Sequence, residues 1–239
     1  MRLLLAALAL LAVAGPAAAA DRAPRTPPPN DAAPDDLPIQ ALGRVNRRTG
    51  GFCTGTLVGN RLVLTAAHCL WDVRTQDWLP PDSLHFVAGY DRGEYRDESA
   101  VARYEMAPER REAGARGKIE LDWAVLVLER TIGGTLGYVP IGDARPLMQG
   151  DRPLPVVHAT YRQDRAHALS VQARCGLTGP AARRVFLHDC AATHGASGAP
   201  LLMRVGGAYR VVAIGVALGK VDGKSVGLAV PATAAELPE

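Results

Sequence analysis

Three polar residues in this 239-residue sequence have types and surroundings that suit chemistry at a serine. His68 follows a run of small residues and directly precedes Cys69. Asp122 stands at the start of an apolar run, where a buried carboxylate is costly unless a hydrogen-bond donor faces it, and the Nδ1 proton of a neutral histidine is such a donor. Ser197 lies in the small-residue segment GASGAP, at 195–200. Its hydroxyl is therefore accessible, and nearby backbone amides are free to point at an oxygen of a reactant.

The four cysteines of the chain could form disulfides close to the segments of His68 and Ser197. Four cysteines allow three pairings, and closeness in sequence favours Cys53 with Cys69 and Cys175 with Cys190. Each bridge would close a local ring worth about 3 kcal/mol in the chain-entropy model. A zinc site is the alternative, but none of the cysteine pairs has the short spacing of a zinc knuckle. We expect two disulfides, the first of which braces the turn of His68, and no metal site.

The segments that must position these residues are typical of short strands. Apolar runs punctuated by Gly, Pro, Asn and Asp occur at 41–45, 53–59, 61–67, 84–90, 123–129, 154–160, 185–189, 200–205, 209–218 and 225–231. Helical periodicity is nearly absent, apart from a possible turn at 66–69 and a short Ala-rich end after Pro231. So many short strands predict closed or sandwiched antiparallel sheets. The Gly- and Pro-rich segment 131–148 divides them into two lobes.

The motifs TAAHC around His68, DWAVLVL from Asp122 and GASGAP around Ser197 follow one another in the order His, Asp, Ser. In these motifs the chain from residue 38 onward resembles the trypsin-like serine peptidases of the chymotrypsin fold, family S1. The segments PIQALGRV and CTGTLVG, and the lack of an Asp directly before Ser197, resemble the bacterial glutamyl-endopeptidase-like branch. The resemblance implies an all-β fold of two antiparallel β-barrels with the active site between them. The barrels are expected at about 38–130 and 149–239, joined by 131–148.

The resemblance also implies a role for each motif residue. Ser197 would be the nucleophile, His68 the general base and then the acid, and Asp122 the carboxylate that fixes the histidine tautomer. The backbone N–H groups of Gly195 and Ser197 would form the oxyanion hole. A serine hydroxyl is a weak nucleophile at neutral pH, so a base within hydrogen-bond reach must take its proton. The expected substrate is a protein or peptide, and neither a metal nor an organic cofactor is expected.

The pocket positions depart from both trypsins and the glutamyl branch. Ala191 stands where trypsins carry the pocket Asp, and Ala192 replaces a Thr of the glutamyl branch. The expected pocket residues are Ala191, Ala192, Val216 and Ala217. They carry no charge, so we expect a small or apolar substrate residue on the acyl side of the cut bond. Ala196 precludes activation by a salt bridge to a newly formed N-terminal amine, because trypsins carry an Asp there.

The beginning of the chain predicts export. Residues 1–20 combine Arg2, a Leu/Ala core and a small-residue end, the pattern of a signal peptide cleaved after Ala20. An uncleaved membrane anchor is the alternative, which Gly15 and Pro16 disfavour. Residues 21–37 are Pro-rich and charged, as in a linker or pro-segment. The mature protein is therefore expected in the periplasm or outside the cell, without stable membrane association.

Composition excludes some classes of protein. The chain is 48% hydrophobic and 21% charged, which rules out disorder throughout. Its 27 basic and 24 acidic residues leave a net charge of +3, and it has no basic block, so we expect no nucleic-acid binding.

Two other functions fit the sequence less well. A catalytically silent binding module on the same fold usually lacks a member of the triad, and here all three residues are present. An esterase on another scaffold would require the order Ser, Asp, His, which is not found. The histidines outside the triad are interpreted as structural or surface residues, with His194 placed to line the cleft; they are His85, His158, His167, His188 and His194. Residues 107–118 are expected to form a solvated loop.

Overall fold

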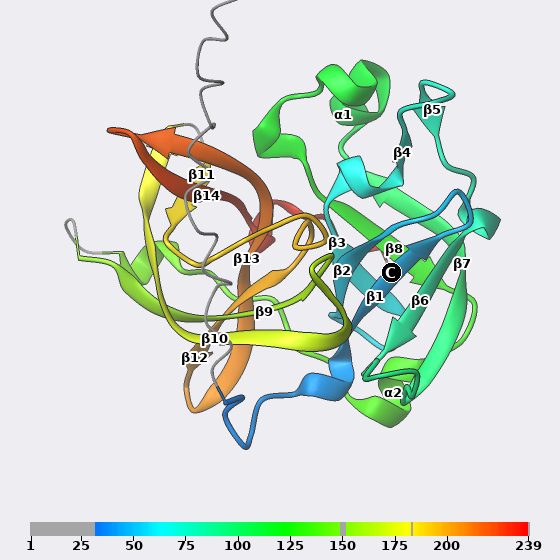
Figure 1. Cartoon of the computed structure of the whole chain (residues 1–239), viewed down its shortest axis with the longest axis horizontal. Helices are drawn as coiled ribbons and strands as arrows, with labels where there is room; N and C mark the ends of the chain where they lie inside the picture. Colours follow the sequence, from blue (N-terminus) through cyan, green and yellow to red (C-terminus); the bar gives the residue numbers. More distant parts are fainter. Residues whose placement is uncertain (1–31, 149–151, 183, 239) are drawn as a thin grey trace, which may run out of the picture.

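The computed structural model describes residues 32–148, 152–182 and 184–238. This part of the chain forms two closed antiparallel β-barrels that lie side by side (Figure 1). A small separate sheet pairs β4 (Trp71–Asp72) with β5 (Asp77–Trp78). The prediction of an all-β double barrel is confirmed. The signal peptide expected at 1–20 and most of the linker expected at 21–37 lie outside the described residues.

The first barrel contains the strands of the N-terminal half, drawn in blue to green in Figure 1. Its strands are neighbours in the order β1, β2, β3, β8, β7, β6, and β6 closes against β1. Val45 of β1 lies opposite Cys53 on one side and Phe86 on the other. The strands are β1 (Leu42–Arg47), β2 (Phe52–Leu57), β3 (Leu62–Thr65), β6 (Leu84–Ala88), β7 (Asp97–Met106) and β8 (Ala124–Leu128).

The second barrel contains the strands of the C-terminal half, drawn in yellow-green to red. Its strands are neighbours in the order β10, β11, β14, β13, β12, β9, and β9 closes against β10. The connection between the barrels carries the short helix α2 (Ile132–Leu136) and a 3-10 turn, η6 (Arg145–Leu147). The strands are β9 (Leu154–Arg162), β10 (Arg165–Ala182), β11 (Val185–His188), β12 (Pro200–Val205), β13 (Ala208–Val221) and β14 (Lys224–Pro231).

The core of the first barrel shows why its strands form where they do. Every residue of β8, the sequence AVLVL, is buried, as expected of a strand with apolar neighbours on both faces. Phe86 fills the space beside Gly43, where a Cβ atom would lie 2.5 Å from the phenylalanine ring. Glycine at this position therefore lets an aromatic ring occupy the barrel interior. Leu37, the last residue of the expected linker, is also buried, in a hydrophobic cluster that contains residues of both barrels.

Two strands, β7 and β10, lie in segments that the apolar runs did not mark. Both have one face in solvent, so charged residues interrupt their apolar residues. In β7, Val101 and Tyr104 are buried while Arg103 and Glu105 are exposed. These strands were missed because a half-buried antiparallel strand lacks a continuous apolar run.

Helices in the described ranges are short. The expected turn at 66–69 corresponds to the 3-10 turn η2 (Ala67–Leu70), and the Ala-rich end corresponds to η7 (Ala232–Ala234). The expectation of a solvated loop at 107–118 was wrong, because this segment contains the helix α1 (Pro108–Ala113) and a buried arginine, Arg110. Nowhere in the described ranges is a helix both long and apolar enough to cross a membrane.

Candidate active site

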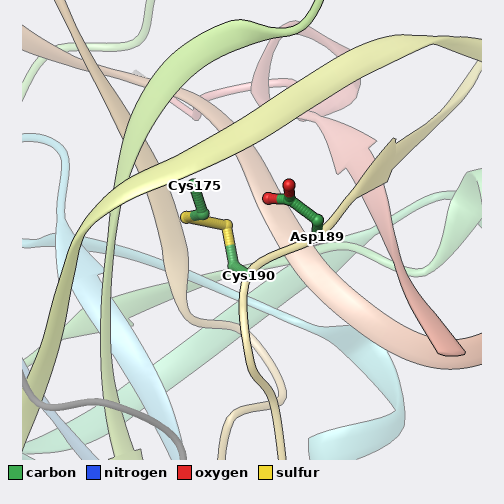
Figure 2. Close-up of side chains that lie close together, drawn as sticks. All are labelled: Cys175, Asp189 and Cys190. Carbon is green, nitrogen blue, oxygen red and sulfur yellow. A yellow bond between two sulfur atoms is a disulfide. The ribbon is translucent and has the colours of Figure 1, made fainter.

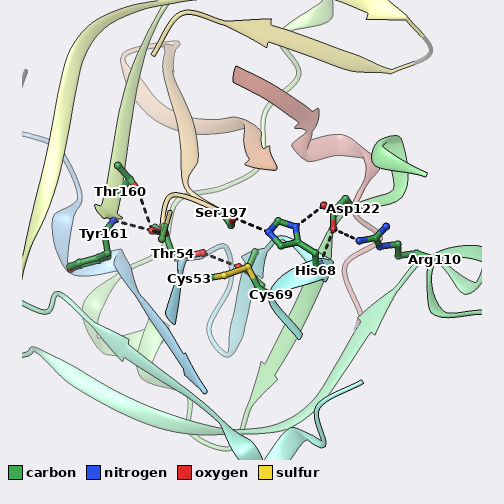
Figure 3. Close-up of a disulfide and its surroundings, with 11 residues drawn as sticks. Cys53, Thr54, His68, Cys69, Arg110, Asp122, Thr160, Tyr161 and Ser197 are labelled. Atoms are coloured by element: carbon green, nitrogen blue, oxygen red, sulfur yellow. Dashed lines mark hydrogen bonds and ion pairs between the residues drawn. A yellow bond between two sulfur atoms is a disulfide. The ribbon is translucent and has the colours of Figure 1, made fainter. Parts of the chain in front are cut away.

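His68 is held at the edge of the first barrel by its neighbours in the chain. It lies in η2, directly after β3, and the next residue, Cys69, forms a disulfide with Cys53 of β2 (Figure 3). The second disulfide joins Cys175 to Cys190, so both bridges are the pairs that spacing favours. The first bridge fixes the turn of His68 to a neighbouring strand, so the imidazole is positioned by the barrel wall.

Asp122 is buried beside the imidazole of His68. It lies between the 3-10 turn η5 (Ile119–Leu121) and β8, and it is 6% exposed. Its Oδ2 atom accepts a hydrogen bond of 2.7 Å from Nδ1 of His68, and its Oδ1 atom accepts one of 2.8 Å from the His68 backbone N–H. Burial alone would raise the pKa of Asp122, but the hydrogen bonds and charge of His68 together with the Arg110 charge hold it below its usual value. The carboxylate is therefore ionised at neutral pH.

Ser197 reaches the same imidazole from the second barrel. It lies in the loop before β12, and its Oγ atom is 2.8 Å from Nε2 of His68. The Nδ1 proton is donated to Asp122, so the Nε2 lone pair is assigned as the acceptor of the serine hydroxyl proton. The backbone N–H of Thr54 donates to the Ser197 carbonyl at 2.9 Å, which docks this loop onto β2. The structure thus brings the three motif residues into one hydrogen-bonded chain across the two barrels (Figure 3).

The backbone next to Ser197 provides two amides that face no acceptor. Within the described ranges, the N–H groups of Gly195 and Ser197 donate to no protein group. Gly195 has φ +91°, and a Cβ atom there would lie 2.7 Å from the Tyr161 carbonyl oxygen. The hydroxyl of Thr54 donates to the Gly195 carbonyl at 3.0 Å. The Gly195 backbone is therefore held by residues of both barrels, and its N–H remains available as a donor, as does that of Ser197.

Comparison with known proteins assigns this arrangement to a family. The model of the trypsin-like peptidase domain matches residues 53–228. The chain belongs to the trypsin-like peptidase family. It is accordingly a serine peptidase, a hydrolase. None of the curated proteins matches its sequence.

Solved structures share the fold. A Glu endopeptidase in complex with MPD aligns with a TM-score of 0.67 at 16% identity, covering 86% of this chain and 91% of that one. The thermostable serine protease AL20, described as coming from an extremophilic microorganism, aligns with a TM-score of 0.60 at 20% identity, covering 81% of this chain and 91% of that one. At these identities the likeness shows the chymotrypsin-like double barrel.

A cleft of about 1290 Å³ opens next to Ser197 in this peptidase. All four expected pocket residues line it, namely Ala191, Ala192, Val216 and Ala217. His194 also lines the cleft, as its place near Ser197 suggested, and so does Asp189. A smaller cavity of about 440 Å³ lies on the first barrel near Asn60 and is separate from the serine.

Two histidines that sequence reasoning assigned to structural or surface positions also line the cleft. They are His158 of β9 and His188 of β11, and their ring centroids are 5.6 Å apart. Burial, with a smaller contribution from His188, lowers the pKa of His158 to about 3. Burial lowers the pKa of His188 to about 4. Both rings are therefore neutral at physiological pH and bring no positive charge to the cleft.

Arg110 is a residue of this site that the motif analysis missed. It projects from α1 and is 4% exposed, and its Nη2 atom lies 3.1 Å from Oδ1 of Asp122 (Figure 3). Its segment, PERREA, reads as polar surface, so periodicity gave no sign that one of its arginines would be buried. Arg110 and Asp122 are twelve residues apart in the sequence. Two 3-10 turns between them, η4 (Gly114–Arg116) and η5, bring the two side chains together, and the sequence alone did not predict these turns.

A group of potential metal ligands lies beside the second disulfide. Cys175, Asp189 and Cys190 place one ligand atom each within 4.8 Å of one another (Figure 2). Both sulfur atoms belong to the disulfide, so neither is available as a thiolate ligand. The Asp189 carboxylate instead accepts a hydrogen bond of 2.6 Å from the Gly176 backbone N–H.

Proposed function

We propose that this protein is an exported serine endopeptidase that cuts peptide bonds through an acyl-enzyme on Ser197. The observation that carries the proposal is the chain of two short hydrogen bonds, 2.8 Å from Ser197 to His68 and 2.7 Å from His68 to Asp122. A nucleophile, a base and an orienting carboxylate in contact make up the machinery of acyl transfer. The His68 side chain is 34% exposed, so a substrate can reach it.

In the proposed reaction, Oγ of Ser197 attacks the carbonyl carbon of the scissile bond while Nε2 of His68 takes the hydroxyl proton. The carbonyl oxygen becomes an oxyanion, which the N–H groups of Gly195 and Ser197 stabilise. The C–N bond then breaks as His68 gives its proton to the leaving amine. Water then attacks the acyl carbon while His68 takes a proton from the water. The ester bond to Oγ breaks as His68 returns that proton to Oγ, which releases the acid product and restores the hydroxyl.

Asp122 has two tasks in this sequence. Its hydrogen bond to Nδ1 holds His68 in the tautomer whose Nε2 can accept a proton. Its negative charge also stabilises the imidazolium that forms during attack. The lowered pKa of Asp122 supports this role, because the carboxylate stays ionised over the neutral pH range.

Substrate selection is proposed to favour a small or apolar residue on the acyl side. The four expected pocket residues are alanines and a valine, and the histidines His158 and His188 beside them are buried and neutral. Asp164, Asp189 and His194 line the same cleft. A charged substrate side chain among the four pocket residues would lose its hydration without meeting an opposite charge from them. One structural relative is named a Glu endopeptidase, but the four expected pocket residues of this chain carry no charge, which argues for a different preference.

Export is part of the proposal. We expect residues 1–20 to be removed as a signal peptide and residues 21–37 to precede a peptidase domain at 38–239. The two disulfides support an oxidising location, the periplasm or the extracellular space. N-terminal sequencing of the protein recovered outside the cytoplasm tests the cleavage after Ala20.

A fluorophosphonate probe tests the nucleophile directly. It should label the parent protein once, and the Ser197→Ala variant should neither be labelled nor hydrolyse peptides. An unchanged unfolding temperature of that variant shows that folding is not the cause. Replacing His68 as well should cause little further loss, because the residues act as a unit. Absence of both labelling and hydrolysis in the folded parent would instead favour the alternative, a catalytically silent binding module on the same fold.

A further inference from the structure

We propose that Arg110 is a positioning residue of this site, whose buried guanidinium keeps the Asp122 carboxylate ionised and turned toward His68. The proposal rests on the proposed function and adds a cation to its three side chains. Figure 3 shows the four residues in one line, with Arg110 at the far side of Asp122 from His68.

The contact between Arg110 and Asp122 is buried on both sides. Their side chains are 5% and 8% exposed, and the Nη2 to Oδ1 distance is 3.1 Å. The second terminal nitrogen, Nη1, donates to the Gly117 carbonyl at 2.8 Å. A buried guanidinium requires an anion, and Asp122 is the carboxylate that meets it among the described residues. The pair is therefore built into the interior rather than formed by mobile surface side chains.

The helix that carries Arg110 is anchored to the small β4–β5 sheet. The indole N–H of Trp78 donates to the Arg111 carbonyl at 2.9 Å. Trp71 packs against Trp78 edge to face at 5.0 Å, and its ring also covers Gly114, where a Cβ would lie 2.6 Å from the ring. These contacts hold α1 in place, so Arg110 approaches Asp122 from a fixed direction.

The two oxygen atoms of Asp122 are divided between different donors. Oδ1 receives Arg110 and the backbone N–H of His68, while Oδ2 receives Nδ1 of His68. With Oδ1 held from two directions, the carboxylate cannot rotate without breaking those bonds, and Oδ2 stays aimed at the imidazole. Arg110 contacts neither Ser197 nor the cleft, so it acts through Asp122.

The charge of Arg110 gives the proposal a signature in the pH profile. His68 and Arg110 are the charged or titratable side chains that act on Asp122 in the described part of the chain. When His68 is neutral, Arg110 supplies the only positive charge that contacts the buried carboxylate among the residues described. Removing that charge makes proton uptake by the Asp122–His68 pair more favourable. The acid limb of kcat/KM should then move to higher pH.

The first test compares Arg110→Met with Arg116→Met, a matched change of an exposed arginine in the neighbouring turn. Turnover is measured per fluorophosphonate-labelled site, so unfolded molecules do not count. We expect Arg110→Met to lower kcat about 10- to 100-fold with little change in KM. Its acid limb should rise by about one pH unit. Arg116→Met should match the parent.

Two further variants separate charge from position. Arg110→Lys keeps the charge and should restore the pH profile and part of kcat. Gly117→Ala keeps every charge, and its backbone at φ −60° accepts alanine, but the new Cβ would lie 2.5 Å from Cδ of Arg110. It should therefore lower kcat by displacing the guanidinium. If Arg110→Met fails to fold, Gly117→Ala and Arg110→Lys carry the test.

The last test asks whether the effect of Arg110→Met requires the Asp122 carboxylate. In an Asp122→Asn background, Arg110→Met should add less than about a threefold loss, because the group it orients is already gone. A folded Arg110→Met or displaced Gly117→Ala protein with the parent's kcat and pH profile would overturn the proposal. So would a full additional loss in the Asp122→Asn background. A parent protein without labelling would overturn the proposed function instead.

Discussion

Replacing Gly195 by alanine should disable the proposed oxyanion hole while leaving the three polar side chains intact. Gly195 has φ +91°, and an added Cβ would lie 2.7 Å from the Tyr161 carbonyl oxygen and 3.0 Å from the Gln163 backbone nitrogen. Both neighbours are backbone atoms of the second barrel, which cannot move aside as a flexible side chain can. The loop must shift instead, and the Gly195 N–H shifts with it.

The magnitude follows from two separate contributions. An alanine in this backbone conformation costs about 1–2 kcal/mol of stability. Loss of one oxyanion donor lowers kcat by about 10²- to 10³-fold, which corresponds to about 3–4 kcal/mol on the barrier. KM should change little, because the donor acts mainly on charge that develops in the transition state.

Gly207→Ala is the matched control for this variant. Gly207 has φ +83°, close to that of Gly195, but nothing lies within 4 Å of a Cβ at this position. It should lose comparable stability and keep the parent's turnover. The assay is hydrolysis of a peptide ester, expressed per labelled serine, with thermal unfolding of each variant. If Gly195→Ala turned over within about threefold of Gly207→Ala, the assignment of this amide to the oxyanion hole would be refuted.

Three further predictions concern the triad, the substrate preference and the two buried histidines. Asp122→Asn should lower kcat by about 10⁴-fold at neutral pH, because an amide at this position favours the wrong imidazole tautomer; a loss below tenfold in hydrolysis assays would contradict that role. Profiling with a peptide library should find small or apolar residues on the acyl side of the cut bond. A preference for Lys or Arg would show that an acid in the cleft reaches the substrate, and a preference for Glu would show that a cation does. Between pH 7 and pH 5, unfolding in urea should reveal a stability loss of about 2 kcal/mol for each of His158 and His188. Their folded pKa values, about 3 and about 4, lie below the unfolded value near 6.5, so the unfolded chain binds protons first. His158→Gln should flatten this slope.

Removing the first disulfide probes how the turn of His68 is held. Cys53→Ala combined with Cys69→Ala should lower the free energy of unfolding by about 3 kcal/mol, measured in urea. The matched removal of Cys175 and Cys190 should cost a similar amount of stability, because the two rings are of similar size. At a temperature where both variants are folded, only the first should also lower kcat. Equal turnover in both would contradict a bracing role for the first bridge.

Local patterns in the sequence were enough to predict most strands, two of the candidate catalytic residues and both disulfides. Apolar runs marked most strands, because a strand with a buried face must carry apolar residues wherever it meets the core. The small residues around Ser197 and the apolar run after Asp122 likewise indicated two candidate catalytic residues. Each of these signals comes from residues adjacent in the sequence, so it does not depend on the tertiary structure. The disulfide pairs could be expected because short rings close most readily.

Only the tertiary structure decided which distant residues meet. The segment of Arg110 reads as polar surface, yet the docking of α1 on the β4–β5 sheet buries this side chain against Asp122. His158 and His188 lie 30 positions apart on separate strands, and barrel closure places their rings together beneath the cleft. The strands β7 and β10 were hidden because solvent-facing charges interrupt their apolar residues. In each case the contact depends on long-range packing, for which sequence spacing provides no period or motif.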